Sequence, residues 1–376
     1  MMKKRDYRPK IHFSPEKGWM NDPNGMVYVD GVYHFFYQKY PYDTSWGPMH
    51  WGHATSRDLI HWEHQPIALY PDELGFIFSG SAVYDTQNSS EYGTNENPPI
   101  IAIYTSHHKD GLEQQSIAYS NDKGRHFEKS YLNPVIKNPG ISDFRDPKAF
   151  WNPVRRCWSL VLAAQDRVFF YASQDMKNWE KTGEFGPEGN HVKGVWECPD
   201  LFEIDGQQIM TCCPQGVDQK GYDYQNVYQC GYFPVEFDLK NKSYSFGKFQ
   251  EFDKGFDIYA TQTFADEAGR RILIGWMGIP DADYDNDATV AYDWIHALTM
   301  PRELEWKDGK ILQHPLKEMK DLRKNAFTCE LEAFTNWAPA DCCFELRLDV
   351  EEAKNLELKL REDVTISWKD GLFTLS

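Results

Sequence analysis

Three acidic residues stand out because each lies within two positions of a proline. They are Asp22 in Asn-Asp-Pro, Asp146 in Arg-Asp-Pro and Glu197 in Glu-Cys-Pro. If the fold brings them together, one carboxylate can attack an anomeric carbon or guide water, while a protonated one gives its proton to the leaving oxygen. Converging carboxylates among aromatic side chains therefore predict cleavage of a glycosidic bond.

Each acid also has a plainer interpretation. Asp22 lies in Trp19–Gly25, where five residues typical of tight turns run together, so its side chain could bond only to its own backbone. Arg145 and Asp146 could form a structural ion pair, and Glu197 could be a surface acid at the end of a strand. The recurrence of three acids at similar places in a repeat favours the catalytic interpretation.

A repeated pattern shows which elements must position these acids. Three segments read Ser-x-Asp, a short turn, an aromatic residue and then Glu, and each follows an apolar strand-like run. They recur at intervals of roughly 50 to 65 residues, which fits a unit of about four strands. The three segments are Ser56–Glu63, Ser120–Glu128 and Ser173–Glu180.

Repeated four-stranded units predict an all-β chain that forms a five-bladed β-propeller over residues 1–315. The first strand of each blade would line the central channel, so the three acids would converge there. Asp30-Gly31 also predicts a tight hairpin between two strands after Asp22. The five expected openings lie at Asp22, 78–84, 144–150, 196–202 and 257–262.

The last part of the chain has a different pattern. Residues 316–328 are expected to form a linker or short helix. Alternating polar and apolar residues at 329–334, 344–350 and 356–360 predict strands with one wet face. Residues 329–376 are therefore interpreted as the start of an incomplete, apparently truncated β-sandwich, whose open edges could support a homo-oligomer.

Composition excludes several classes of partner. The 376 residues are 41% hydrophobic and 15% aromatic, with a formal net charge of −17 that argues against nucleic-acid binding. The sequence has no long apolar run for a membrane span, and no apolar stretch after the basic start that would indicate a signal peptide. We therefore expect a cytoplasmic protein whose eight cysteines are free thiols, with no metal and no cofactor.

Four motifs together resemble the invertase-type β-fructofuranosidases of glycoside hydrolase family 32. They are Trp-Met-Asn-Asp-Pro-Asn-Gly at 19–25, Phe-Ser-Gly-Ser at 78–81, Phe-Arg-Asp-Pro at 144–147 and Glu-Cys-Pro-Asp at 197–200. The resemblance implies a propeller followed by a β-sandwich. It also implies retaining hydrolysis of a terminal β-D-fructofuranosyl bond, with Asp22 as nucleophile, Asp146 as transition-state stabiliser and Glu197 as acid/base. Arg145 would keep Asp146 ionised.

The resemblance further implies a set of substrate contacts. For the four aromatic residues among them, packing in the core is the alternative. The hydrogen-bonding residues would be Asn21, Gln38, Ser79 and Arg145, and the walls of the pocket would be Trp19, Trp46, Phe78 and Trp276.

The expected substrate is a small sugar: sucrose, sucrose 6-phosphate or a short fructo-oligosaccharide. A phosphate would need cations at the rim, for which Lys39, His107, His108 and Lys109 are candidates. Two alternative functions stay open. One is a non-catalytic fructoside-binding protein on the same scaffold, and the other is an inverting five-bladed arabinosidase or xylosidase.

Overall fold

The structure is a computed structural model that describes residues 7–186, 192–238, 243–330, 343–349, 354–360 and 364–375. It divides into two compact units, the first ending at Leu322 and the second beginning at Arg323. This boundary falls within the segment 316–328, which was expected to be a linker. The first unit closes with a 3₁₀ helix, η1 (Lys317–Leu322).

Five antiparallel sheets follow one another along the first unit, each built on a path of four strands. The first sheet contains β1 (Trp19–Val29), β2 (Val32–Tyr40), β3 (His50–Ser56) and β4 (Trp62–Leu69). The second contains β5 (Phe76–Tyr84), β6 (Ile100–His107), β7 (Glu113–Ser120) and β8 (Glu128–Lys129). The third contains β9 (Phe144–Asn152), β10 (Cys157–Ala164), β11 (Arg167–Ser173) and β12 (Glu180–Phe185).

The fourth and fifth sheets each carry one additional short strand. The fourth contains β13 (Trp196–Ile204), β14 (Gln207–Pro214), β15 (Gly231–Asp238) and β16 (Ser243–Phe246), with β17 (Gln250–Glu251) beside β15. The fifth contains β18 (Tyr259–Ala265), β19 (Arg271–Met277), β21 (Arg302–Lys307) and β22 (Lys310–Pro315), with β20 (Ala297–Leu298) beside β19.

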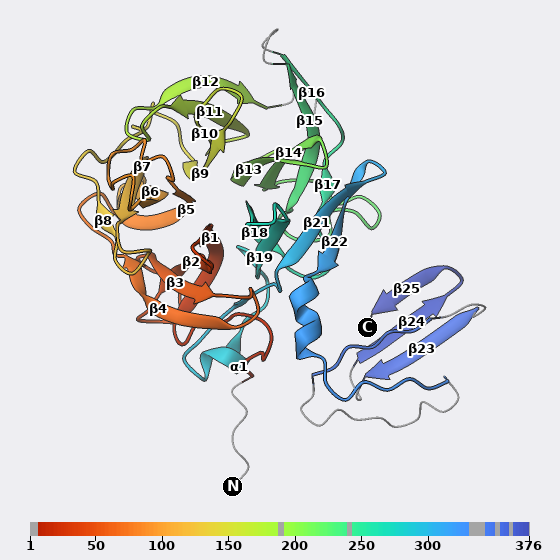
Figure 1. Ribbon diagram of the computed structural model, residues 1–376. Coiled ribbons are helices and arrows are strands. Elements are labelled where there is room, and N and C mark those ends of the chain that lie inside the picture. The colour runs from red at the N-terminus through yellow and green to blue at the C-terminus, as the bar shows by residue number, and fades with distance from the viewer. Residues whose placement is uncertain are drawn as a thin grey trace. The chain divides into compact units, whose positions relative to one another are not determined.

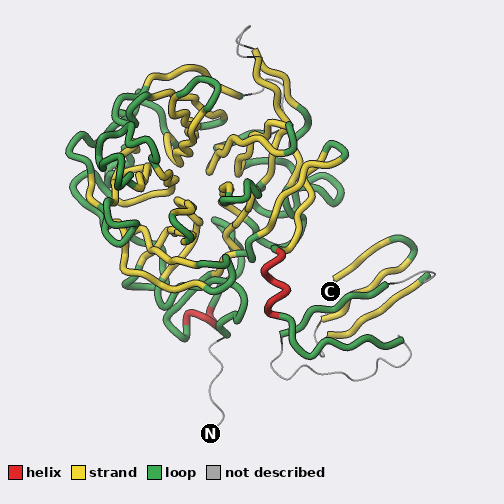
Figure 2. The backbone as a smooth tube through the Cα atoms, in the orientation of Figure 1, coloured by secondary structure: helices red, strands yellow, loops and turns green. Residues whose placement is uncertain are grey.

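The first strands of the five sheets form a closed circle of neighbours. β1 contacts β5, β5 contacts β9, β9 contacts β13, β13 contacts β18, and β18 contacts β1 again. Figure 1 shows these strands nearest the middle of the first unit, with the later strands of each sheet farther out. Figure 2 shows how little helix interrupts them: α1 (Asp287–Val290) and η1 are short. The prediction of an all-β chain is confirmed.

Side chains on the inner strands link neighbouring sheets near the middle of the unit. The Ser81 hydroxyl donates to the Pro147 carbonyl at 2.8 Å, and the Gln262 amide donates to the Gly80 carbonyl at 2.9 Å. Lys148 and Asp200 form a buried ion pair at 3.2 Å, and the Thr263 hydroxyl donates to the same carboxylate. Because buried polar groups are costly unless paired, these contacts fix how the inner strands are arranged.

The predicted hairpin at Asp30-Gly31 is confirmed, since both residues have the positive φ that a tight primed turn requires. The interpretation of Trp19–Gly25 as a tight turn is wrong, because all seven residues lie in β1. Two register shifts in β1, between Met20 and Pro23 and between Asn24 and Val27, accommodate these turn-type residues within a strand. Pro23 lies beside the first shift, where a ladder tolerates proline.

The Ser-x-Asp repeat forms the same turn in the first three sheets. In each case the serine hydroxyl ends the third strand and donates to the aspartate two residues later, at 2.9–3.0 Å. That carboxylate in turn accepts backbone N–H groups of the turn. The repeat therefore marks the connection from the third strand to the fourth in each of these sheets.

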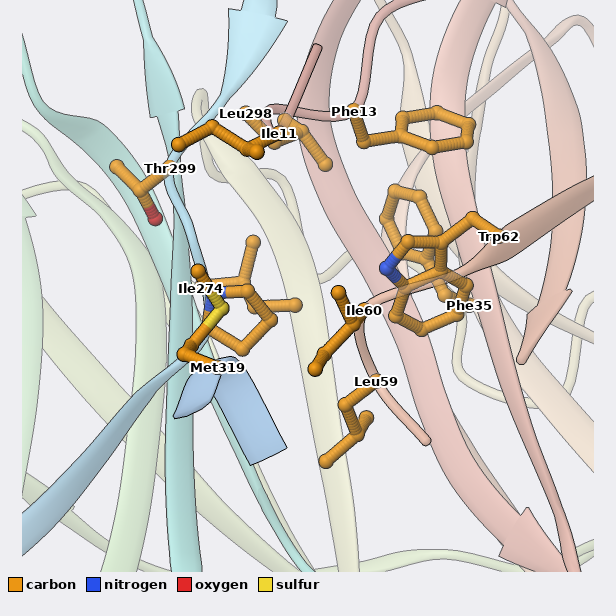
Figure 3. Close-up of a pocket in the computed structure, with 11 residues that line it drawn as sticks. Ile11, Phe13, Phe35, Leu59, Ile60, Trp62, Ile274, Leu298, Thr299 and Met319 are labelled. Carbon is orange, nitrogen blue, oxygen red and sulfur yellow. The ribbon is translucent and has the colours of Figure 1, made fainter. Parts of the chain in front are cut away.

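The ring closes where the start of the chain meets the fifth sheet. Backbone bonds join Gly18 to Asp293 at 2.7 Å and Leu298 to Phe13 at 2.9 Å. Figure 3 shows the apolar seam beside this junction, with Phe13, Phe35 and Trp62 facing residues that include Ile274 and Met319. The cavity left between them is only about 10 Å³, so the closure is a packed hydrophobic contact.

The second unit contains one sheet of β23 (Asn355–Leu360), β24 (Val364–Lys369) and β25 (Leu372–Leu375). β23 agrees with the strand expected at 356–360. The strand expected at 344–350 is not formed over 344–349, because a strand needs a partner and, in the described part of this unit, pairing joins only β23, β24 and β25. Most of the strand expected at 329–334 lies outside the described residues, as does Cys342.

Candidate active site

The first strand of every sheet contains the same irregularity in pairing near its beginning. The pairing shifts between Met20 and Pro23, Ile77 and Gly80, Arg145 and Lys148, Glu197 and Asp200, and Tyr259 and Gln262. At each place two residues of the first strand lie opposite one residue of the second. Such a β-bulge re-aims side chains and is common beside active sites.

The three predicted acids all lie at these bulges. Asp22 and Asp146 are within the bulges of β1 and β9, and Glu197 is the last paired residue before the bulge of β13. Asp146 and Cys198 have φ values of 64° and 48°, a conformation that non-glycine residues seldom adopt. The recurrence seen in the sequence is therefore a repeated bulge, with the acids at slightly different positions around it.

Asp22 is held by three side chains. The Ser79 hydroxyl donates to Oδ2 at 2.6 Å, the Asn21 amide donates to Oδ1 at 2.9 Å, and the Cys198 thiol lies 3.7 Å from Oδ2. Asn21 is itself oriented by the Trp19 indole N–H at 2.8 Å. These donors favour an ionised carboxylate in a fixed orientation, as a nucleophile needs.

Cys198 connects the acids of three sheets. Its backbone N–H donates to Asp146 Oδ2 at 2.9 Å, its thiol approaches Asp22, and it directly follows Glu197. Asp146 is only 5% exposed, and its own N–H donates to the Thr105 hydroxyl at 3.0 Å. One buried residue thus lies between the three carboxylates, and the structure brings together the acids that the sequence singled out.

Arg145 pairs with acids other than its neighbour in the sequence. Its guanidinium contacts Glu197 at 2.9 Å, Asp143 at 2.7 Å and Glu113 at 3.2 Å. The structural ion pair with Asp146, which was the alternative interpretation, is not among its salt bridges. The chain geometry explains this, because the bulge after Arg145 turns the next side chain away from it.

Burial raises the pKa of two of the acids. Burial, helped by the negative charge of Glu197, raises the pKa of Asp22 to about 6 against the effect of the Ser79 hydrogen bond. Burial also raises the pKa of Asp146 to about 7, although the positive charge of Arg145 acts in the opposite direction. Arg145 thus favours the ionised form of Asp146, although burial has the larger effect on its pKa.

Two residues of the site were missed in the sequence. The Tyr259 hydroxyl lies 2.5 Å from Glu197 Oε2 and 3.0 Å from the Cys213 carbonyl, and the Gln215 amide donates to the same Oε2 at 2.9 Å. Tyr259 can donate to Glu197 when the carboxylate is ionised, or accept from it and donate to Cys213 when it is protonated. Tyr259 could have been found as the residue that takes the place of Glu197 at the fifth bulge.

The predicted substrate contacts fall into two groups. The donors of Asn21, Ser79 and Arg145 are already bonded to site acids. Gln38 and Trp276 are 2% and 4% exposed, yet their Nε2 and Nε1 atoms have no protein partner. Buried donors normally find an acceptor, so these two predicted contacts differ from the others in having unsatisfied N–H groups.

The other predicted wall residues make ring contacts with one another or with a histidine. Phe78 stacks on His107 with 4.1 Å between ring centroids, and Trp46, 52% exposed, meets Phe78 edge-on at 6.1 Å. Trp19 meets His296 edge-on at 4.5 Å, and Trp276 meets the same imidazole from another side at 4.9 Å. These rings give the site apolar walls beside its carboxylates.

The described residues contain no group of three or more His, Cys, Asp or Glu side chains placed to hold a metal ion. In the same part of the chain no helix has the length and apolarity needed to cross a membrane. The described cysteines are free, and five of them are buried.

Comparison with known proteins decides the family. Residues 12–315 match the model of the glycosyl hydrolases family 32 N-terminal domain. The chain belongs to glycoside hydrolase family 32. The resemblance inferred from the four motifs is therefore confirmed.

Curated family 32 relatives include enzymes with different printed substrates. A levanase of Bacillus subtilis (strain 168) is 46% identical over 336 residues, an alignment that covers 85% of this chain and 48% of the levanase. A sucrose-6-phosphate hydrolase of Escherichia coli is 38% identical over 336 residues, with 85% and 66% covered. The chain thus spans about half the length of the levanase and about two thirds of the length of the hydrolase.

Solved family 32 structures agree. A β-fructofuranosidase of Bombyx mori has a TM-score of 0.77 and 40% identity, covering 85% of this chain and 68% of that one. A sucrose-6-phosphate hydrolase of Lactobacillus gasseri has a TM-score of 0.74 and 30% identity, with 85% and 66% covered. A variant of the Bombyx enzyme was solved in complex with sucrose.

Proposed function

We propose that the chain is a retaining β-fructofuranosidase that releases terminal fructose from sucrose or short fructo-oligosaccharides. Its first unit would be a five-bladed β-propeller, with the five sheets as blades. The observation that carries the proposal is the approach of Asp22, Asp146 and Glu197 around Cys198. The names of the family 32 relatives add support for a fructoside as the substrate.

In the first step, an Asp22 oxygen forms a bond to the anomeric carbon of the fructosyl unit. The bond to the leaving oxygen breaks, and Glu197 gives that oxygen its proton. In the second step Glu197 takes a proton from water, the water oxygen bonds to the anomeric carbon, and Asp22 is released. Tyr259 gives Glu197 a hydrogen-bond partner in both protonation states.

Asp146 would act through hydrogen bonds to the fructose hydroxyl groups. Its Oδ2 is held by the Cys198 N–H, and its position in the bulge directs it away from Arg145. Gln38 and Trp276 would donate their unpaired N–H groups to other hydroxyls of the same sugar. Binding that strengthens as positive charge develops on the ring lowers the barrier.

The rim contacts favour an uncharged fructoside over a phosphorylated one. His107 lies 3.2 Å from Glu113, and His108 lies 2.8 Å from Asp110. The Lys39 ammonium is bonded to the Lys17 carbonyl, and the residue is only 8% exposed. Three of the four candidate cations thus have a partner that would compete with a phosphate, and the fourth, Lys109, is exposed.

The test is hydrolysis of sucrose and sucrose 6-phosphate by the wild type, Asp22→Ala and Glu197→Ala. We expect kcat to fall at least about 100-fold in both variants, the usual loss of an acid/base or nucleophile. The control is Glu203→Ala, an exposed acid on the same strand as Glu197, which should keep wild-type activity. Early NMR spectra of the product should show β-fructofuranose before it equilibrates.

The outcomes separate the alternatives. Release of the α-anomer first would indicate inversion and overturn the double displacement. A folded protein that binds sucrose without cleaving it would support the binding-protein alternative. Faster cleavage of sucrose 6-phosphate than of sucrose would overturn the preference for an uncharged substrate.

A further inference from the structure

Outside the site, four aromatic side chains form a row across the first sheet, at the end of the sheet that contains Asp22. We call Tyr40, Tyr42, His50 and Tyr70 the aromatic row. Neighbouring rings meet edge-on, with centroids 5.7 Å apart for Tyr40 and Tyr42, 5.8 Å for Tyr42 and His50, and 5.4 Å for His50 and Tyr70. The row is therefore continuous.

The strand pairing fixes the direction of the row. Tyr40 is paired with Trp19 of β1, His50 is paired with Lys39 of β2, and Tyr70 directly follows β4. The row thus starts on β2, next to the site strand β1, and runs outward past β3 to the end of β4, and Figure 1 shows these strands in that order from the middle of the unit to its edge. From β2 to the end of β4 the row crosses two strand spacings, about 10 Å, which is longer than one monosaccharide.

The exposed members of the row are large aromatic residues with hydroxyl groups. Tyr42 is 72% exposed and Tyr70 is 52% exposed, while His50 between them is only 4% exposed. His50 Nδ1 lies 2.8 Å from the Pro48 carbonyl, so a neutral ring donates there and keeps Nε2 as an acceptor. Rings that present an apolar face and a polar tip suit a sugar, which has apolar C–H faces and hydroxyl edges.

Backbone contacts hold the row in place before any ligand binds. The Asp43 carbonyl accepts the Trp19 N–H at 2.9 Å, which ties the segment after β2 to the site strand. The Tyr70 carbonyl accepts a hydrogen bond from Lys129 of the second sheet at 2.5 Å. A surface that is already ordered loses less entropy on binding.

We propose that the aromatic row is a binding site for the part of an uncharged oligofructoside that extends out of the catalytic pocket, past Trp46. Gly47 connects the two places, because it packs against the ring of Tyr40 and directly follows Trp46. The inference rests on the proposed function and narrows it, since it assigns the chain a preference for substrates longer than a disaccharide.

The experiment compares kcat/KM on sucrose, 1-kestose, nystose and levan oligosaccharides for the wild type and Tyr42→Ala/Tyr70→Ala. We expect kcat/KM of the variant to fall roughly five- to tenfold on the longest chains, because two stacking contacts are lost. On sucrose kcat/KM should fall less than about twofold. The control is Tyr131→Ala, an 89% exposed tyrosine in the turn after β8, which should leave the dependence on chain length unchanged. Thermal unfolding should show that both variants are folded.

A second readout separates binding from catalysis. In an Asp22→Asn background, calorimetric titration with nystose should give weaker binding when Tyr42 and Tyr70 are also replaced. Equal losses on sucrose and on long chains, or no loss on any chain, would overturn the inference. If the wild type cleaves no fructoside at all, the proposed function fails instead.

Discussion

Asp22 lies where burial and hydrogen bonding act on the carboxylate in opposite directions. Burial raises its pKa to about 6, and the Ser79 hydroxyl, 2.6 Å away, lowers it. A nucleophile must be ionised, so kcat/KM on sucrose should fall as the pH drops below about 6. The pH at which activity falls on the acidic side, here called the acidic limb, therefore measures the balance between burial and the Ser79 hydrogen bond.

The first prediction concerns Ser79→Ala. Loss of the hydroxyl removes a donor that favours the charged form, so the acidic limb should move upward by about one pH unit. The measurement is the pH profile of kcat/KM on sucrose. The control is Ser116→Ala, which removes a buried hydroxyl of β7 that is bonded to Ser106 of β6. It should leave the pH at which activity falls unchanged. A limb that moves downward in Ser79→Ala would contradict the argument.

The second prediction concerns stability. The pKa of Asp22 is higher in the folded state than in the unfolded chain, where it is about 4. Protonated Asp22 therefore stabilises the fold fully below about pH 4, and this stabilisation is lost as the pH rises through about 6. Asp22→Asn should therefore increase the free energy of unfolding at pH 7.5 by about 3 kcal/mol. The gain should vanish near pH 4.

Urea unfolding at the two pH values measures this difference. Glu96→Gln changes an exposed acid and should have no effect at either pH. Equal stability of Asp22→Asn and the wild type at pH 7.5 would mean that the carboxylate is not destabilising in the folded protein.

At the scale of the elements, the repeated bulge builds the site. At the bulge of β5, the backbone of Gly80 lies close to the backbone of β6, which leaves no room for a side chain. A Cβ atom on Gly80 would lie 2.1 Å from the Ile103 carbonyl oxygen. Its N–H donates to Asn24 at 3.0 Å, and its carbonyl accepts from Gln262. Gly80 thus links the second sheet to the first and the fifth, next to Ser79.

The third prediction is that Gly80→Ala reduces both stability and activity. The added methyl group must push β5 away from β6, which should cost more than about 2 kcal/mol and displace Ser79 from Asp22. Chemical denaturation and sucrose hydrolysis measure the two losses. Gly183→Ala is the matched control, because its added Cβ would make only an ordinary contact with Phe170 in an outer strand. Full activity in Gly80→Ala would show that the bulge tolerates displacement.

At the scale of the first unit, residues from its beginning and from its fifth sheet close the ring. Leu298 is 1% exposed in the seam shown in Figure 3, and its N–H donates to the Phe13 carbonyl. Closure by packed side chains makes the five sheets depend on one another, since opening the seam would expose the apolar side chains on both of its sides.

The fourth prediction is that Leu298→Ala destabilises the whole first unit. Truncation of a buried leucine typically costs about 2–5 kcal/mol, and the small seam cavity would grow. The loss should appear in one cooperative transition followed by tryptophan fluorescence. Leu132→Ala, at a 41% exposed leucine, should change stability by less than about 1 kcal/mol. Separate transitions for different sheets would contradict a cooperative closure.

The amino-acid sequence by itself determined the all-β class, the Ser-x-Asp turns, the hairpin at Asp30-Gly31 and the family. Each depends on local residue types or on motifs that can be read along the chain. The three acids could also be singled out, because each lies within two positions of a proline in a recurring pattern.

Only the tertiary structure decided how these residues act on one another. The bulge in β1 depends on its pairing with β2, so Trp19–Gly25 is a strand despite its turn-type residues. The partners of Arg145 come from β7, β13 and the residue before β9, and Tyr259 reaches Glu197 from another sheet. Burial, pairing and pKa depend on groups far apart in the sequence, which only the folded chain brings within contact distance.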